Sequence, residues 1–142
     1  MTAQRFTYAD GDLGPRAKFD IQLGSALNDQ DQFAARLQNA NIELKTERFQ
    51  WEQTGNICIE YAWDGKPSGI AATPADFWVH ELARGDATLL YLMIPVPHLK
   101  QICREAYAAG NYRKGVGDGG HSDVILLKIK DLLKVAACLP DQ

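Results

Sequence analysis

Stretches in which apolar residues alternate with polar ones, or form an unbroken run, predict the strands of this chain. Residues 42–47 and 56–63 alternate, whereas residues 88–94 form a continuous apolar run that Pro95 ends. A continuous run of this kind is typical of a buried strand. Strands are therefore expected over residues 19–23, 42–47, 56–63, 88–94 and 124–127.

Capping residues and apolar residues at helical spacing predict helices between these strands. Residues 28–31 offer side-chain acceptors suited to a helix N-cap, and a helix is expected from there to residues 39–41. Thr73 followed by Pro74 predicts a second helix over residues 75–82. A third helix is expected from the spacing of Leu99, Ile102, Cys103 and Ala106, and a short basic helix should follow residue 127. This order predicts a mixed α/β domain with a central sheet covered by helices.

The alternation in residues 42–47 and 56–63 divides polar from apolar side chains. It places Ile42 and Leu44 on one face, and Glu43 and Lys45 on the other. We expect the two strands to form a hairpin around residues 54–55, with their apolar faces sharing a core. Glu43, Lys45 and Glu60 should then emerge together on the opposite face.

Composition narrows the class of protein. A chain of 142 residues with 46% hydrophobic and 23% charged residues matches one folded domain. No apolar run approaches the roughly 20 residues of a membrane helix, and the first residues lack the apolar core of a signal peptide, so we expect a cytoplasmic protein without membrane contact. Cys58, Cys103 and Cys138 lack the paired spacing of a zinc site and are expected to be buried thiols.

Charge is distributed unevenly along the chain, although the net charge is only -3. Residues 1–97 hold 8 Lys and Arg against 13 Asp and Glu, whereas residues 98–142 hold 7 against 5. An acidic N-terminal part and a basic C-terminal part would suit a metal site beside a phosphate-binding surface. The alternative is that the difference in charge arises by chance.

Two carboxylates and a lysine on one face of a sheet have a specific chemical use. Carboxylate oxygens are hard ligands that suit Mg²⁺ or Mn²⁺. Lys45, two residues from Glu43, can position a water or stabilise a phosphate in the transition state. The alternative is a solvated sheet face with cross-strand ion pairs, because the pattern Glu-x-Lys is too short to be specific.

Other polar residues are weaker candidates. Lys66 and Ser68 lie in an expected turn and either contact a phosphate or simply form the turn. His121 lies in a glycine-rich loop near Arg113 and Lys114, which can hold a DNA backbone or form an ordinary surface loop. The loop lacks the residue order of a nucleotide-binding P-loop. His80 and His98 are interpreted as structural or surface residues.

The ordered series of motifs around these residues resembles the PD-(D/E)XK nuclease superfamily, most closely its small phage-type members. The series consists of the residues 42–48, 54–61, 66–70, Thr73 and 75–78. The lead-in residues 19–24 and the helix from Asp29 are also similar, so the resemblance covers about residues 19–80.

The resemblance implies a restriction-endonuclease-like core with the order α-β-β-β-α-β and a metal-dependent activity. It assigns metal binding to Glu43 and assistance to the attacking water to Lys45, with Glu60 as the acid of the following strand. Asp20 and Asp31 are further metal-ligand candidates. The chain departs from the pattern in its first helix, where Gln30 stands between Asp29 and Asp31 in place of a frequent Glu.

We therefore expect residues 1–142 to form a single nuclease-like domain, with the motif region at about 19–80 and a loop and basic helix within 98–142. The expected function is a Mg²⁺- or Mn²⁺-dependent DNA endonuclease, encoded by a phage or prophage, in DNA recombination, replication or degradation. A junction resolvase is one such enzyme, and a homodimer would allow both strands to be cut. The alternative is an inactive nuclease-fold module that binds nucleic acid or protein.

Overall fold

The computed structural model describes residues 28–132, and the chain divides into two units, residues 1–39 and 40–142. In the first unit, residues 28–38 are helical, as the capping and spacing pattern predicts. The strand expected at residues 19–23, which includes Asp20, lies outside the described residues. Cys138 also lies outside them.

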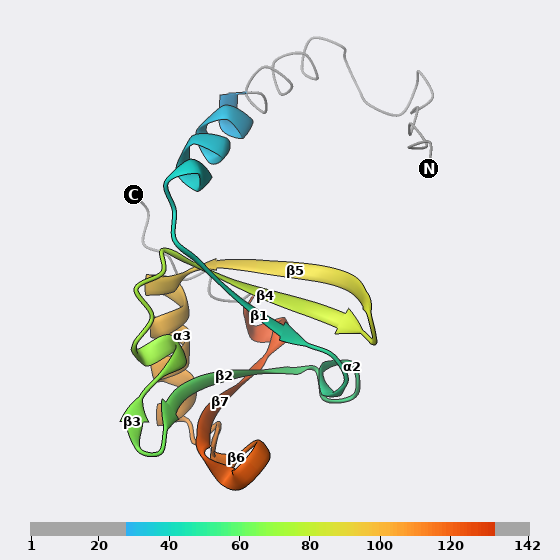
Figure 1. Ribbon diagram of the computed structural model, residues 1–142, viewed down its shortest axis with the longest axis vertical. Helices are drawn as coiled ribbons and strands as arrows, with labels where there is room; N and C mark the ends of the chain where they lie inside the picture. The colour runs from blue at the N-terminus through green and yellow to red at the C-terminus, as the bar shows by residue number, and fades with distance from the viewer. Residues whose placement is uncertain (1–27, 133–142) are drawn as a thin grey trace. The chain divides into compact units, whose positions relative to one another are not determined.

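The second unit contains two β-sheets (Figure 1). The first sheet has the order β1-β4-β5, in which β1 (Ile42–Glu47) runs parallel to β4 (Phe77–Arg84), and β4 runs antiparallel to β5 (Ala87–Pro95). The second sheet is antiparallel throughout and has the order β3-β2-β7-β6. Its strands are β2 (Asn56–Trp63), β3 (Lys66–Pro67), β6 (Tyr112–Val116) and β7 (Ser122–Lys128).

Helix α3 (Val96–Ala108) covers one face of the second sheet and supplies much of the core. Pro97 stands in its first turn, where a missing backbone N–H is not needed. The apolar face predicted from the sequence is confirmed. It consists of Leu99, Ile102 and Cys103, with Val96 added and Ala106 partly buried, and it packs with Ile57, Ile59, Ile125 and Leu127 of the sheet.

The remaining helical segments are short. They are α2 (Gln50–Thr54), α4 (Ile129–Leu132) and the 3-10 segments η1 (Gly69–Ala71) and η2 (Asp118–Gly120). The Arg84 guanidinium of β4 makes two 2.8 Å bonds to Glu52, and the Trp51 indole donates to the carbonyl of Ala83. These bonds attach α2 to β4 and so fix the connection between β1 and β2.

The prediction of a helix over residues 75–82 is wrong, because most of this segment belongs to strand β4. Trp78, His80 and Leu82 are buried while the residues between them are partly exposed, which is a period of two. Pairing with a strand on each edge overrides the local signal. The Thr73 hydroxyl, expected to cap a helix, instead accepts from the Ala75 N–H in a turn.

Two further expectations are wrong. The strands β1 and β2 do not form a hairpin, because α2 separates them and they belong to different sheets. Strand β5 is not fully buried, because it lies at a sheet edge and leaves Leu89, Leu90 and Tyr91 about half exposed, at 49%, 48% and 57%. The coarse class, a mixed α/β protein with sheets flanked by helices, is confirmed.

Among residues 28–132, no helix has the length and apolar character needed to cross a membrane.

Candidate functional site

The side chains of Glu43, Lys45 and Glu47 project from the same face of β1, because alternate residues of a strand share a face. The Lys45 ammonium lies 3.0 Å from Oε1 of Glu43 and 5.8 Å from the ring centre of Trp78 on β4. Lys45 is therefore held by a carboxylate and by the electron-rich face of an aromatic ring.

The carboxyl of Glu43 is surrounded by hydrogen-bond donors. Burial raises its pKa, but hydrogen bonds from Thr73 and Lys45, together with the Lys45 charge, lower it by more. The net result is a pKa below the ordinary value of 4.5. Glu43 is therefore ionised at neutral pH, as a metal ligand must be.

Glu60, on β2, is fixed by two hydroxyl groups. The Ser68 hydroxyl donates to Oε1 over 2.6 Å, and the Ser122 hydroxyl of β7 donates to Oε2 over 2.7 Å. Each carboxylate oxygen keeps a further lone pair for another donor or a cation. Ser68, for which the sequence left a phosphate contact and a plain turn as alternatives, thus orients Glu60.

The backbone geometry explains why a glycine, Gly69, follows Ser68. Its φ of +48° is in the left-handed region, and a Cβ placed there would lie 2.2 Å from the backbone oxygen of Glu60. Only glycine allows the η1 segment to lie this close to β2. The same close approach carries the Ser68 hydroxyl to the Glu60 carboxylate.

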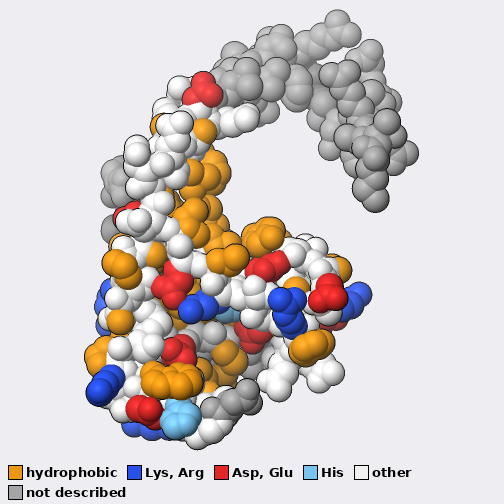
Figure 2. Space-filling model, viewed as in Figure 1, with side chains coloured by type: hydrophobic (Ala, Val, Ile, Leu, Met, Phe, Trp, Pro, Cys, Tyr) orange, Lys and Arg blue, Asp and Glu red, His pale blue; other side chains and the backbone are white. Residues whose placement is uncertain are grey.

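A cleft of about 260 Å³ opens between strands β1 and β4 of the first sheet and strand β2 of the second. Its lining residues come from both sheets and are Lys45, Thr46, Glu47, Cys58, Glu60, Trp78 and His80. The structure thus brings Lys45 and Glu60 together across two sheets rather than across a hairpin. Figure 2 shows acidic and basic side chains gathered around a hollow on this face.

Glu47 joins the two sheets at this cleft. Its Oε2 accepts from the Cys58 N–H of β2 over 3.1 Å and lies 2.8 Å from Nε2 of His80 on β4. The Nδ1 atom of His80 accepts from the Trp78 indole over 3.2 Å, so the proton of the imidazole is on Nε2 and points at Glu47.

Sequence reasoning did not single out the pair of Glu47 and His80. His80 is buried, so the structural alternative of its interpretation is confirmed and the surface alternative is wrong. It also forms part of the cleft wall. One signal was present, because Glu47 follows Lys45 by two residues and must share its face. No sequence signal placed β4 beside β1.

The two described cysteines differ from the expectation of buried thiols. Cys103 is buried, whereas Cys58 is exposed and lines the cleft. Loss of hydration and the negative charge of Glu47 raise the pKa of the Cys58 thiol to about 11. It is therefore a neutral thiol at physiological pH and a poor nucleophile.

The residues expected to bind nucleic acid are placed in two groups. Directly opposed residues of an antiparallel pair share a face, so the register places Arg113 and Lys66 on the Glu60 face of the second sheet. Trp63 lies on this face, 46% exposed, with the His121 ring stacked on it at 5.3 Å.

His121 is also bound to Asp64, with 2.5 Å between Nδ1 and a carboxylate oxygen. Lys114 is exposed on β6. Asp31 belongs to the helix of the other unit, so only Glu43 and Glu60 of the expected metal ligands lie on the two sheets.

The donor chemistry at the cleft fits Mg²⁺ or Mn²⁺, but the number of donors is small. In the part of the chain that the structure describes, no three His, Cys, Asp or Glu side chains are grouped to hold a metal. Mg²⁺ commonly binds one or two protein carboxylates and completes its octahedron with water and substrate phosphate. Glu60 lines the cleft with Lys45, and Glu43 is paired with Lys45, so these two carboxylates are the ligands available for that lower requirement.

Fold and site together define a mixed α/β domain with a carboxylate–lysine cleft between two sheets. No protein-family model, curated protein or solved structure matches the chain.

Proposed function

We propose that this chain is a metal-dependent nuclease that hydrolyses phosphodiester bonds of DNA. One observation supports it most strongly. Lys45, paired with an ionised Glu43, lines the same cleft as Glu60, whose carboxylate two serine hydroxyls orient. The combination of hard oxygen ligands and a nearby cation is the set that metal-assisted phosphodiester hydrolysis uses.

The roles follow from the chemistry of each group. Glu43 and Glu60 would hold Mg²⁺ or Mn²⁺, and the bound ion supplies a Lewis acid and a water of lowered pKa. Lys45 would position the attacking water and neutralise charge that develops on the phosphate. Ser68 and Ser122 keep the Glu60 carboxylate in one orientation, which spares the cost of ordering it during the reaction.

Basic and aromatic residues near Glu60 would bind the DNA. Lys66 and Arg113 share its sheet face, and Trp63 offers a flat apolar ring there. Lys114 and His121 would add contacts to the backbone from β6 and from the loop before β7. A phage or prophage role in DNA recombination, replication or degradation, including junction resolution by a homodimer, belongs to this proposal.

A second candidate is a nuclease-fold module that binds nucleic acid or protein without catalysis. Among residues 28–132, no three side chains of His, Cys, Asp or Glu are grouped to hold a metal, and this favours the module. So does the fact that Glu43, Glu47 and Glu60 already accept hydrogen bonds within the protein.

Substrate and metal dependence separate the two candidates. The full chain is incubated with supercoiled plasmid, linear duplex, single strands and a four-way junction, each with Mg²⁺, Mn²⁺ or EDTA. Cleavage that needs the metal, and that Glu43→Gln abolishes, supports the nuclease, and the preferred DNA identifies its role. Binding of DNA without cleavage under every condition supports the module.

A further inference from the structure

A second cavity, of about 500 Å³, lies between helix α3 and the second sheet. It is lined by Tyr61, Ile70, Ala71, Lys100, Cys103, Arg104, Tyr107 and Ile125. Its size is within the range of about 300 to 1,000 Å³ that is usual for small-molecule sites. Glu60 and Tyr61 are neighbours on β2, but Glu60 faces the cleft described above, so the two sites are separate.

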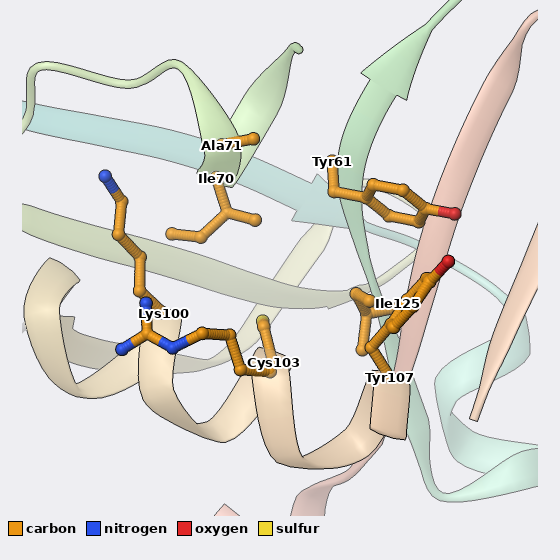
Figure 3. Close-up of a pocket in the computed structure, with 8 residues that line it drawn as sticks. Tyr61, Ile70, Ala71, Lys100, Cys103, Tyr107 and Ile125 are labelled. Carbon is orange, nitrogen blue, oxygen red and sulfur yellow. The ribbon is translucent and has the colours of Figure 1, made fainter. Parts of the chain in front are cut away.

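The cavity has a cationic side and an aromatic side (Figure 3). Lys100 and Arg104 are four residues apart on α3, which places them on the same face of the helix. Within residues 28–132, neither forms an ion pair with a carboxylate. Two positive charges therefore remain available to a ligand at one end of the cavity.

Tyrosine rings form the opposite end. The rings of Tyr61 and Tyr107 meet edge to face at 5.7 Å, and Tyr107 is stacked on Tyr112 at 4.4 Å. These contacts hold the rings in place before any ligand arrives, which reduces the entropy lost on binding.

The floor between the two ends is apolar. Ile70 and Ile125 are each 3% exposed, and Cys103 is 5% exposed. Burial raises the pKa of the Cys103 thiol to about 12 despite the nearby Arg104 charge, so this sulfur is neutral and apolar at physiological pH. A ligand in this cavity thus meets carbon, sulfur and aromatic rings on most sides and positive charge on one.

We propose that this cavity binds a small aromatic anion, a planar ring that carries a phosphate or carboxylate group. The ring lies against Tyr61, Tyr107 and the apolar floor, and the acidic group lies between Lys100 and Arg104. A nucleoside monophosphate and an aromatic carboxylate share this chemistry. The proposal does not depend on the nuclease activity, because no residue of the carboxylate–lysine cleft lines this cavity.

Calorimetric titration of the full chain tests the proposal with five compounds. Adenosine monophosphate and 1-naphthoate carry both a ring and a charge, adenosine and 1-naphthalenemethanol carry the ring alone, and inorganic phosphate carries the charge alone. We expect adenosine monophosphate, 1-naphthoate or both to bind about tenfold or more tightly than the neutral analogue of the same ring, and also than inorganic phosphate. The loss of one charge contact of about 1.4 kcal/mol corresponds to this tenfold difference in Kd. The compound that binds shows whether the cavity prefers a nucleoside monophosphate or an aromatic carboxylate.

Variants assign the binding to the cavity. The double variant Lys100→Ala with Arg104→Ala should weaken binding about tenfold or more, and Ala71→Trp, which fills the cavity from an exposed position, should abolish it. Lys130→Ala, at an exposed lysine on α4, is the matched control and should bind normally. The proposal is overturned if neither aromatic anion binds, if the neutral rings or phosphate bind equally well, or if the double variant binds normally.

Discussion

At the scale of single residues, the carboxylates of Glu60 in the cleft and of Glu43 beside Lys45 are held by named donors rather than left to solvent. Glu60 accepts from Ser68 and Ser122, and Glu43 accepts from Lys45 and Thr73. A hydrogen bond to a charged group contributes about 1.5 to 3 kcal/mol, more than a bond between neutral groups. The site should therefore add measurably to the stability of the fold.

Ser122→Ala should lower the free energy of unfolding by about 1.5 to 3 kcal/mol, because Ser122 is 9% exposed and its loss leaves one Glu60 oxygen without this donor. Urea unfolding measures the change. The same substitution in a Glu60→Ala background should cost clearly less, since the acceptor is then absent. Equal costs in both backgrounds would contradict the hydrogen bond.

Glu43→Gln should destabilise the protein in a pH-dependent way. The folded pKa of Glu43 is lower than its ordinary value of 4.5, so the ionised carboxylate stabilises the fold fully above that value. This contribution is lost as the pH falls through the lower folded pKa. The melting temperatures of wild type and variant should differ at pH 7 and converge as the pH falls below 4.5 and through the lower folded pKa. A difference that stays constant over this range would be inconsistent with the depressed pKa.

The sequence anticipated part of this site for a simple reason. The period of two in β1 and β2 is a local property, and it placed Glu43 and Lys45 on one face and Glu60 on the polar face of its strand. The Glu47–His80 contact was beyond this reasoning, because it depends on the pairing of β1 with β4, which are distant in the sequence.

At the scale of elements, the close approach of η1 to β2 builds the Glu60 environment, and glycine makes it possible. Residues 66–69 were recognised in the sequence as a turn, but the contact between Gly69 and the backbone of Glu60 is a tertiary feature that local chemistry does not reveal. Strand β4 shows the same limit. Thr73 and Pro74, which precede it, resembled the start of a helix, and only pairing with β1 and β5 selects the strand.

Gly69→Ala should destabilise the protein by at least about 2 kcal/mol, because the new Cβ would lie 2.2 Å from the Glu60 oxygen in addition to adopting a positive φ. Gly65→Ala is the matched control. Gly65 also has a positive φ, +74°, but nothing lies within 4 Å of its Cβ position, so only about 1 kcal/mol of backbone strain is expected. Thermal or urea unfolding that gives equal losses for the two variants would contradict the packing of η1 on β2.

At the scale of the whole molecule, the cleft is lined by residues of both sheets, from β1 and β4 of the first and from β2 of the second. Neither sheet forms the cleft alone, because Lys45 comes from one sheet and Glu60 from the other. The sequence predicted the mixed α/β class from the order of elements, but it did not predict the division into two sheets, since strand pairing depends on contacts between distant segments. A ligand that bridges the cleft should therefore stabilise both sheets at once.

Mn²⁺ should raise the melting temperature of the full chain in proportion to its binding. A metal present at 100 times its Kd adds about 2.7 kcal/mol to the free energy of unfolding. Glu60→Gln should remove most of the shift, whereas Gln101→Ala, at an exposed position on α3, should retain it. A shift of equal size in Glu60→Gln would show that the metal binds elsewhere.

The rate of metal-dependent DNA cleavage by Lys45→Ala, compared with wild type and with Lys130→Ala, shows whether the cleft is the active site. Because Lys45 is the cation of the cleft, its loss should reduce the cleavage rate by about 100-fold or more at saturating Mg²⁺. Lys130→Ala removes an exposed lysine of α4 and should cleave at the wild-type rate. Cleavage by Lys45→Ala at the wild-type rate would contradict the assignment of the active site to this cleft.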